Sequence, residues 1–312
     1  MTALISVVMP VLNAAAWLDE AIASILTQTH ENLELIVVDD GSADDSREIA
    51  ARAAARDSRV RTLCLNPAPE LTSSSRAANA GLAMARGRWI ARMDADDIAL
   101  PRRLELQLAF LEERELDACG GLAQNFGVDV EDGLFSYSET GPAIDRELIF
   151  RVGILHPTLL ARAELMRAHP YREQASHEDY EWLVRVSASG ARLGNLQEVI
   201  LRHRTHPDQA HRRHFPLFVR DLRRYRFLHV MRLFPGTRPA DYQVLAQLAE
   251  ETETDPATLP ATGAWLIRLA EVPDPGLRHL LARRWEMACD RAGVAPGDPV
   301  RERVGGQIRA GG

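Results

Sequence analysis

The chain has 312 residues, of which 46% are hydrophobic and 26% are charged, which is the composition of an ordinary globular protein. A formal net charge of −7 argues against a general nucleic-acid binder, because such a protein needs a basic surface to displace counterions. The three cysteines are far apart and form no C-x-x-C pair, which argues against a disulfide framework or zinc knuckle and favours a reducing cytoplasm.

Two hydrophobic periods alternate through the first hundred residues. Continuous apolar, β-branched runs predict buried strands over Leu4–Met9, Leu33–Val38, Val60–Leu65 and Trp89–Met93. Amphipathic stretches predict helices over Ala14–Leu26, from Asp44 or Asp45 to about Arg56, over Ser75–Ala85, and from Pro101 to about Arg114. This repetition implies right-handed crossovers and a mostly parallel sheet flanked by helices, the α/β class.

The remainder of the chain is less regular. The expected elements are a mixed, Gly-rich segment over Ala118–Tyr137, a short element at His156–Thr158, a helix over Ser176–Ser189 and a strand over Asn195–His203. After about His211 the sequence reads as helices broken by prolines. We therefore expect an α/β domain over residues 1–211 and a helical region over residues 212–312.

No run of about 18 apolar residues and no basic, apolar leader occurs, so we expect no transmembrane helix and no signal peptide.

His214–Phe234 mixes arginines with Leu, Phe and Val at helical spacing. Such a helix could rest on an anionic membrane surface, or it could pack on the first domain or on a dimer partner. Peripheral contact with the inner face of the membrane and a homo-oligomer therefore both remain open.

Polar residues gather where the predicted strands end, which is where open α/β sheets bind ligands. Asp94-Ala95-Asp96-Asp97 follows the fourth strand. Two carboxylates one residue apart can face one cleft and suit Mg²⁺ or Mn²⁺, with substrate phosphates completing the ligand shell. The competing interpretation is an acidic turn that caps the helix after Pro101.

Two further strand ends and helix starts carry candidate nucleotide ligands. Asp40, in Asp39–Ser42, could accept a base N–H or a ribose hydroxyl, although Asp and Gly together also favour an ordinary turn. Arg76 and Asn79 lie one turn apart at the start of a helix, where an Arg fork and the helix N-terminus favour anions. The alternative is a solvated arginine on a helix surface.

Acidic and basic residues also occur later in the chain. Glu178 and Asp179 begin a predicted helix, where one could act as a general base, although acidic residues are common in a first helical turn. A basic stretch could close on a diphosphate, supply a metal ligand, or form a solvated linker. It contains His203, His206, His211 and His214 together with Arg202, Arg204, Arg212 and Arg213.

Several established motifs are absent from the sequence. No G-x-G-x-x-G follows the first strand, no G-x-x-x-x-G-K-[ST] occurs, and no G-x-S-x-G is present. These absences disfavour a dinucleotide-dependent dehydrogenase, a P-loop enzyme and an α/β-hydrolase.

Four stretches together resemble the family 2 glycosyltransferases, over about residues 4–210. They are ISVVMPVLNAAAWLDEAIASILTQTHENLELIVVDDGSADDS, SRAANAGLAMARGRWIARMDADD, HPTLLARAELM and HEDYEWLVRVS. Each motif alone is weak, but their order and spacing are specific. The resemblance implies the GT-A fold, a Rossmann-like sheet flanked by helices, here with a C-terminal helical extension. It also implies inverting transfer of a sugar from a nucleotide diphosphate-sugar to an acceptor hydroxyl, with a divalent metal, Mn²⁺ or Mg²⁺.

The resemblance also implies roles for individual residues. Asp96 would bind the metal, with Asp94 at the metal or ribose, and Asp179 would be the catalytic base, with Glu178 the close alternative. Pro10 and Asn13 would lie at the nucleotide edge. The remaining nucleotide-sugar positions are Leu12, Asp40, Arg76, His156 and His206.

Leu12 departs from the family pattern, because many relatives place an aromatic residue there to stack on the base. UDP-, GDP- and dTDP-sugars therefore all remain open as donors. The acceptor would be a saccharide or a lipid-linked molecule in bacterial-type polysaccharide or glycoconjugate assembly. The alternatives are a non-catalytic nucleotide-sugar-binding module and a sugar-1-phosphate nucleotidyltransferase, although no Gly-rich basic loop follows the first strand.

Overall fold

The computed structural model describes residues 3–67, 74–128, 133–173, 177–206, 215–250 and 254–311, with the backbone alone for residues 215–221. The chain divides into two compact units. The first contains residues 1–136 and 154–221, and the second contains residues 137–153 and 222–312. Each unit has a hydrophobic core of its own.

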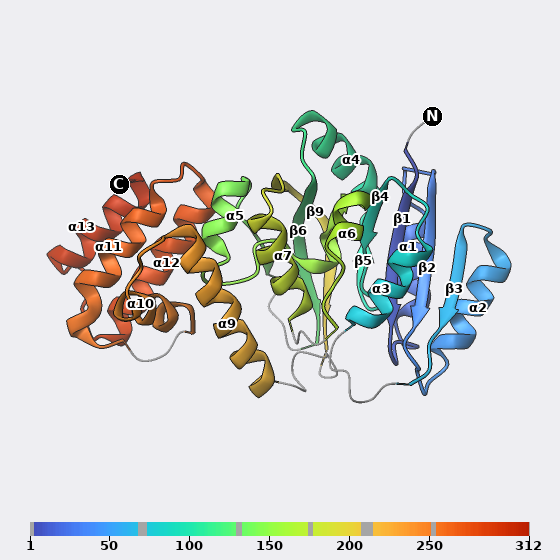
Figure 1. Cartoon of the computed structure of the whole chain (residues 1–312), viewed down its shortest axis with the longest axis horizontal. Coiled ribbons are helices and arrows are strands. Elements are labelled where there is room, and N and C mark those ends of the chain that lie inside the picture. Colours follow the sequence, from blue (N-terminus) through green and yellow to red (C-terminus); the bar gives the residue numbers. More distant parts are fainter. Residues whose placement is uncertain are drawn as a thin grey trace. The chain divides into compact units, whose positions relative to one another are not determined.

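One mixed sheet forms the centre of the first unit (Figure 1). Its strands within the described residues are β1 (Ile5–Val11), β2 (Leu33–Asp39), β3 (Val60–Cys64), β4 (Trp89–Arg92), β5 (Ile98–Ala99), β6 (Ala118–Gly127), β7 (Leu134–Phe135), β8 (Leu160–Arg162) and β9 (Leu193–Thr205). Their order is β3-β2-β1-β4-β8-β6-β9-β5, with β7 paired to β6. The predicted parallel sheet is found in β3-β2-β1-β4 and again in the β6–β9 pair, whereas β8, β5 and β7 run antiparallel to their neighbours.

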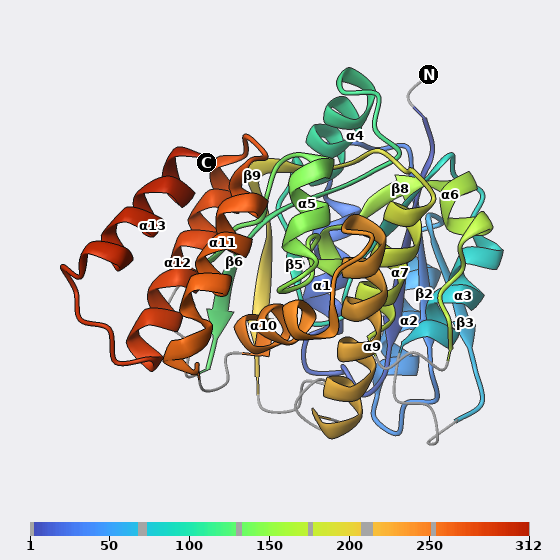
Figure 2. The same cartoon turned by 60° about the vertical axis from the view of Figure 1, so that its left-hand side comes forward.

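Helices flank this sheet, as the two views of the chain show (Figure 2). They are α1 (Leu18–Leu26), α2 (Ser46–Arg56), α3 (Ser75–Met84), α4 (Arg103–Glu113), α6 (Ala163–Ala168) and α7 (Glu178–Ala188), with a 3₁₀ turn η1 (His156–Thr158). Val7 and Met9 of β1 share a core with Leu18 of α1. Val8 points to the other face, where a Cβ added to Gly81 of α3 would lie 2.5 Å from its Cγ1 atom. Burial on both faces explains why β1 is apolar at nearly every position.

The segment between β1 and α1 differs from the prediction. We expected the helix to begin at Ala14, but it begins at Leu18. The N–H of Ala14 donates to Ser46 Oγ, and the N–H of Ala15 donates to Asp44 Oδ2, both at 2.9 Å. These bonds hold the chain against the loop after β2 and so delay the first helical turn.

The second unit is helical. It contains α5 (Gly141–Glu147), the larger part of α9 (Phe215–Leu233), α10 (Pro239–Glu250), a 3₁₀ turn η2 (Pro256–Thr258), α11 (Leu259–Ala270), α12 (Pro275–Arg291) and α13 (Pro299–Ala310). Leu266, Leu281 and Trp285 are in its core. Within the parts of the chain that the structure describes, no helix is both long enough and apolar enough to cross a membrane.

Residues 137–153 belong to the second unit, although β8 and β9 of the first unit follow them in the chain. Asp274, the N-cap of α12, explains part of this arrangement. Its Oδ1 atom accepts from Leu277 N at 2.9 Å, while its Oδ2 atom accepts from Glu139 N at 3.0 Å and Thr140 N at 3.2 Å. One buried carboxylate therefore caps a helix and fixes a segment from far earlier in the chain.

Candidate active site

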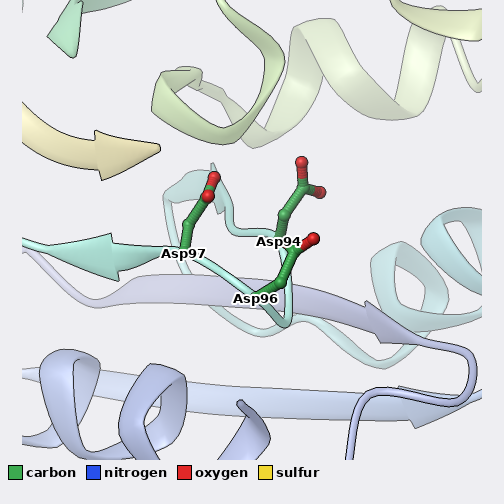
Figure 3. Close-up of side chains that lie close together, drawn as sticks. All are labelled: Asp94, Asp96 and Asp97. Carbon is green, nitrogen blue, oxygen red and sulfur yellow. The ribbon is translucent and has the colours of Figure 1, made fainter. Parts of the chain in front are cut away.

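Three carboxylates lie together in the loop between β4 and β5. Asp94, Asp96 and Asp97 each offer an oxygen atom, and these atoms lie within 4.8 Å of one another. Figure 3 shows the three side chains rising from this one loop. The loop follows β4, which lies parallel to β1, so the cluster is at the carboxyl edge of the parallel strands.

Two of these carboxylates each lie next to a basic side chain. Arg92 Nη1 lies 2.8 Å from Asp94 Oδ1, and His206 Nε2 lies 3.0 Å from Asp96 Oδ2. His206 also stacks on Trp17, with 4.0 Å between the ring centroids. The predicted metal ligands therefore lie where a strand end, the β1–α1 loop and the residue after β9 converge.

Asp97 is the most buried member of the cluster. Its Oδ1 atom accepts the N–H of Arg204 at 2.8 Å, and its Oδ2 atom has no hydrogen-bond partner among the described residues. Arg204 Nε also donates to the carbonyl of Asp96 at 2.7 Å. Arg204 thus ties the end of β9 to the acidic loop.

The pKa values reflect the crowding of charge. Burial raises the pKa of Asp96, and the charge of Asp94 raises it further. Burial also raises the pKa of Asp97 well above its usual value, helped by the charge of Asp96. At Asp94 burial acts in the same direction, but the surrounding basic groups, chiefly the positive charge of Arg92, outweigh it and lower the pKa. Crowded hard oxygen atoms of this kind fit a divalent cation such as Mg²⁺ or Mn²⁺.

The loop after β2 carries Asp40. Arg76 Nε, at the start of α3, donates to Asp40 Oδ1 at 3.0 Å, and Arg76 Nη2 donates to the carbonyl of Asn66 at 2.7 Å. Burial raises the pKa of Asp40 even though Arg76 acts in the opposite direction. The structure therefore joins two predicted nucleotide ligands, Asp40 and Arg76, in one ion pair.

The end of β1 carries the other predicted nucleotide residues. Pro10 is buried within the strand, whereas the Leu12 side chain just beyond it is 58% exposed. Asn13 has a φ of 55°, donates its N–H to Ser42 Oγ at 2.9 Å, and accepts from Ala43 N at 2.8 Å. Asn13 thus joins the β1 and β2 loops.

The first turn of α7 carries the two candidate bases. Glu178 Oε1 accepts from the hydroxyl of Ser74 at 2.8 Å, and Asp179 Oδ1 accepts from Tyr180 N at 2.7 Å. Burial, followed by the charge of Asp179, raises the pKa of Glu178 to about 7. Ser74 also accepts from Arg92 Nη2 at 3.2 Å, which connects this turn to the acidic cluster.

His156 lies close to the charged groups of Arg92, Asp94 and Asp179. Its Nε2 atom is 2.8 Å from the hydroxyl of Tyr171, and burial and the charge of Arg92 lower its pKa to about 4. The imidazole is therefore neutral near pH 7. Asn79, which we considered as a ligand, instead bonds both backbone groups of Tyr171, at 2.9 Å and 3.0 Å.

Arg92 was not predicted from the sequence as a site residue, and Arg204 was considered only as one of the arginines in the stretch around His203 and His206. Arg92 is the one charged residue of the buried strand β4 and lies two residues before Asp94, and that position was an available signal. The sequence does not distinguish Arg204 from the basic residues beside it, and only its contacts with Asp96 and Asp97 do so. His211 and His214, named with the same stretch, lie outside the described residues.

The sequence profile described as "Glycosyl transferase family 2" matches residues 6–162. The chain is 34% identical over 224 residues to the putative glycosyltransferase EpsE of Bacillus subtilis, covering 68% of this chain and 76% of EpsE. It is 31% identical over 212 residues to the O-antigen biosynthesis glycosyltransferase WbnJ of Escherichia coli, covering 65% of this chain and 80% of WbnJ.

Solved structures resemble the chain as well. Residues 1–349 of S. aureus TarS, in complex with UDP-GlcNAc, give a TM-score of 0.61 at 19% identity, covering 98% of this chain and 92% of that one. The mannosyltransferase PcManGT from Pyrobaculum calidifontis, in complex with GDP-Man and Mn²⁺, gives 0.57 at 18% identity, covering 98% and 85%. These likenesses confirm the predicted GT-A fold. The chain belongs to the family 2 glycosyltransferases.

Proposed function

We propose that the protein is an inverting, metal-dependent glycosyltransferase that moves a sugar from a nucleotide diphosphate-sugar to an acceptor hydroxyl. The observation that carries the proposal is the Asp94–Asp96–Asp97 cluster, joined through Arg92 and Ser74 to Glu178 in the first turn of α7. The complexes of TarS with UDP-GlcNAc and of PcManGT with GDP-Man and Mn²⁺ support a donor and a metal of these kinds.

Asp96 and Asp94 would hold the cation, either Mn²⁺ or Mg²⁺. Their oxygen atoms lie close together, and Asp97 contributes a further buried carboxylate oxygen without a partner among the described residues. When bound, such a cation neutralises charge on a diphosphate leaving group. Hard oxygen ligands and a phosphate-bearing substrate are the usual partners of both ions.

The chain's own residues would bind the nucleotide and accept the proton. Asp40 and Arg76 would hold the base and its ribose, with Leu12, Asn13 and the backbone of Pro10 along the same edge. His156 and His206 would lie nearer the sugar and diphosphate. The exposed Leu12 covers a base without ring stacking, so UDP-, GDP- and dTDP-sugars are all candidate donors.

The transfer step is a single displacement at the sugar C1 atom. Asp179, with Glu178 as the alternative, takes the proton of the acceptor hydroxyl as that oxygen forms the new bond to C1. The bond from C1 to the diphosphate oxygen breaks, and the nucleoside diphosphate leaves with the electron pair. The configuration at C1 inverts, and no covalent enzyme intermediate forms.

The name of WbnJ supports a role in polysaccharide or glycoconjugate assembly, with a saccharide or lipid-linked acceptor. The three cysteines are free, which suits work in the cytoplasm, with peripheral contact at the inner face of the membrane. A homo-oligomer is part of the same proposal. Membership of the family leaves no reason to retain the nucleotidyltransferase alternative.

A thermal-shift panel tests the donor site. UDP, GDP, dTDP and CMP are each added with and without Mn²⁺, because a ligand that binds only the folded state raises Tm. One nucleotide should raise Tm in a metal-dependent way, and the matching nucleotide-sugars should then be turned over. Binding without turnover of any such sugar would instead favour a non-catalytic binding module.

A further inference from the structure

A chain of polar contacts joins the acidic cluster to the first turn of α7. Arg92 Nη1 lies 2.8 Å from Asp94 Oδ1, and Arg92 Nη2 donates to Ser74 Oγ at 3.2 Å. The Ser74 hydroxyl then donates to Glu178 Oε1 at 2.8 Å. A hydroxyl has a single proton, and Arg92 occupies one of its lone pairs. The direction of the Ser74 proton is therefore fixed toward Glu178.

The arginine at the start of this chain is itself held in place. Arg92 ends β4 and is 4% exposed. Its carbonyl accepts from Nη2 of the fully buried Arg103 at 2.8 Å, and its guanidinium also donates to the carbonyl of Met93. The guanidinium cannot move away from Ser74 without also losing its contacts with Asp94 and with the carbonyl of Met93. Arg92 is thus a fixed reference point for Ser74.

The two carboxylates in the first turn of α7 have different contacts. Glu178 and Asp179 are consecutive residues of one helix, so their side chains leave the axis about 100° apart. Glu178 is the one that reaches Ser74. Asp179 Oδ1 instead accepts the N–H of Tyr180 in its own helix. The hydroxyl of Ser74 therefore holds Glu178, and the carboxylate of Asp179 lies outside this series of contacts.

We infer that Glu178 is a positioning residue, held by Arg92 through Ser74, and that it fixes the first turn of α7 so that Asp179 receives the acceptor's proton. The inference rests on the proposed transfer function and divides between two residues a role that the sequence left shared. Ser74 also directly precedes α3, the helix that carries Arg76. This series of polar contacts therefore links the proposed nucleotide site at Arg76 to the proposed acceptor site at Asp179.

A matched pair of amide substitutions tests the division of roles. Glu178→Gln and Asp179→Asn each replace a carboxylate by an amide of the same shape. An amide oxygen at position 178 still accepts from Ser74 but is a weaker acceptor than a carboxylate, so Glu178→Gln should lower kcat by about fivefold. Asp179→Asn should lower kcat by roughly 10²–10⁴-fold. Equal loss in the two variants would overturn the inference, because it would make Glu178 a base.

A double-mutant cycle tests the link to Ser74. Ser74→Ala and Glu178→Ala should each lower kcat by about tenfold. The double variant should lose no more than either alone, because each single substitution already removes the Ser74–Glu178 contact. Ser74→Thr keeps the hydroxyl and should restore most of kcat. The Kd of the bound nucleoside diphosphate, measured by calorimetry, should stay within about threefold throughout, which shows that the donor site is folded.

Multiplicative losses in the cycle, or full kcat in Ser74→Ala, would overturn the positioning role. The wild-type enzyme is assayed first with UDP-, GDP- and dTDP-sugars. Absence of turnover by the wild type would overturn the proposed function and this role together. Wild-type turnover with Glu178→Gln as impaired as Asp179→Asn would overturn this role alone.

Discussion

His206 Nε2 lies 3.0 Å from Asp96 Oδ2, although the two residues are far apart in the sequence. Their contact brings the residue that follows β9 onto the loop that follows β4. Trp17 covers the imidazole from the β1–α1 loop, so Asp96 is enclosed by three separate segments. The proposed donor site therefore depends on contacts between distant segments and not on the acidic motif alone.

Asp96→Asn should remove the metal-dependent part of the activity. The amide keeps the shape of the side chain but loses the charge that a divalent cation requires. We expect kcat/KM to fall by roughly 10²-fold or more, and the Mn²⁺-dependent rise in Tm with nucleotide to disappear. Glu113→Gln is the matched control, because it also neutralises one carboxylate but on the exposed face of α4. A wild-type Mn²⁺ response in the Asp96→Asn variant would contradict the assignment.

Asp40→Asn should weaken nucleotide binding more than catalysis. The substitution removes the charge that holds Arg76, so it disturbs both predicted nucleotide ligands at once. Loss of a charge-assisted hydrogen bond costs about 1.5–3 kcal/mol, which is roughly 10- to 150-fold in Kd. Calorimetric titration with UDP, GDP and dTDP measures the effect. Arg76→Ala should give a comparable loss, and unchanged nucleotide affinity in both variants would exclude the pair from the donor site.

The carboxylate of Glu34 should make the free energy of unfolding depend on pH under acidic conditions. Burial acts to raise the pKa of Glu34, but hydrogen bonds from Ser6, Arg86 and Arg61 outweigh it and lower the pKa from 4.5 to about 2. A carboxylate with a depressed folded-state pKa stabilises the protein above pH 4.5, and that stabilisation is lost as the pH falls through about 2. The contribution is about 3 kcal/mol at neutral pH.

Urea denaturation between pH 7 and pH 2 measures this contribution. Glu34→Gln should lower the free energy of unfolding by about 3 kcal/mol at pH 7 and should flatten its decline below about pH 4.5. The wild type and the variant should converge at the acid end. A variant that loses the same amount at every pH would show that packing, rather than the charge of Glu34, is responsible.

Charged substitutions on α9 test the proposed contact with a membrane. Phe227 is 41% exposed and Leu228 is 53% exposed, next to the exposed Arg224. Binding of such a helix to anionic vesicles depends on apolar burial together with electrostatic attraction. The double substitution Phe227→Glu and Leu228→Glu should reduce co-sedimentation with phosphatidylglycerol vesicles by about tenfold or more. Val300→Glu, on α13, is the control for a charge added at an exposed apolar position. Failure of the wild type to sediment would favour a packing role for α9.

Local patterns predicted much of the first unit. The runs at β1, β2 and β4 could be recognised because strands buried on both faces are apolar at most positions. The positions of Asp40 and Asp94–Asp97 at strand ends followed from the same pattern. Their roles came from resemblance to the family and stay predictions until variants are measured.

Other features have no local signature. The sequence by itself determined which segments are strands and helices and which strand ends carry carboxylates, since these depend on hydrophobic period and turn chemistry. Tertiary structure alone decided that β6 pairs in parallel with β9, that residues 137–153 join the second unit, and that Arg92 reaches Ser74. These relationships depend on strand register and on contacts between distant segments, because a buried charge is stable only where the folded chain brings a partner to it.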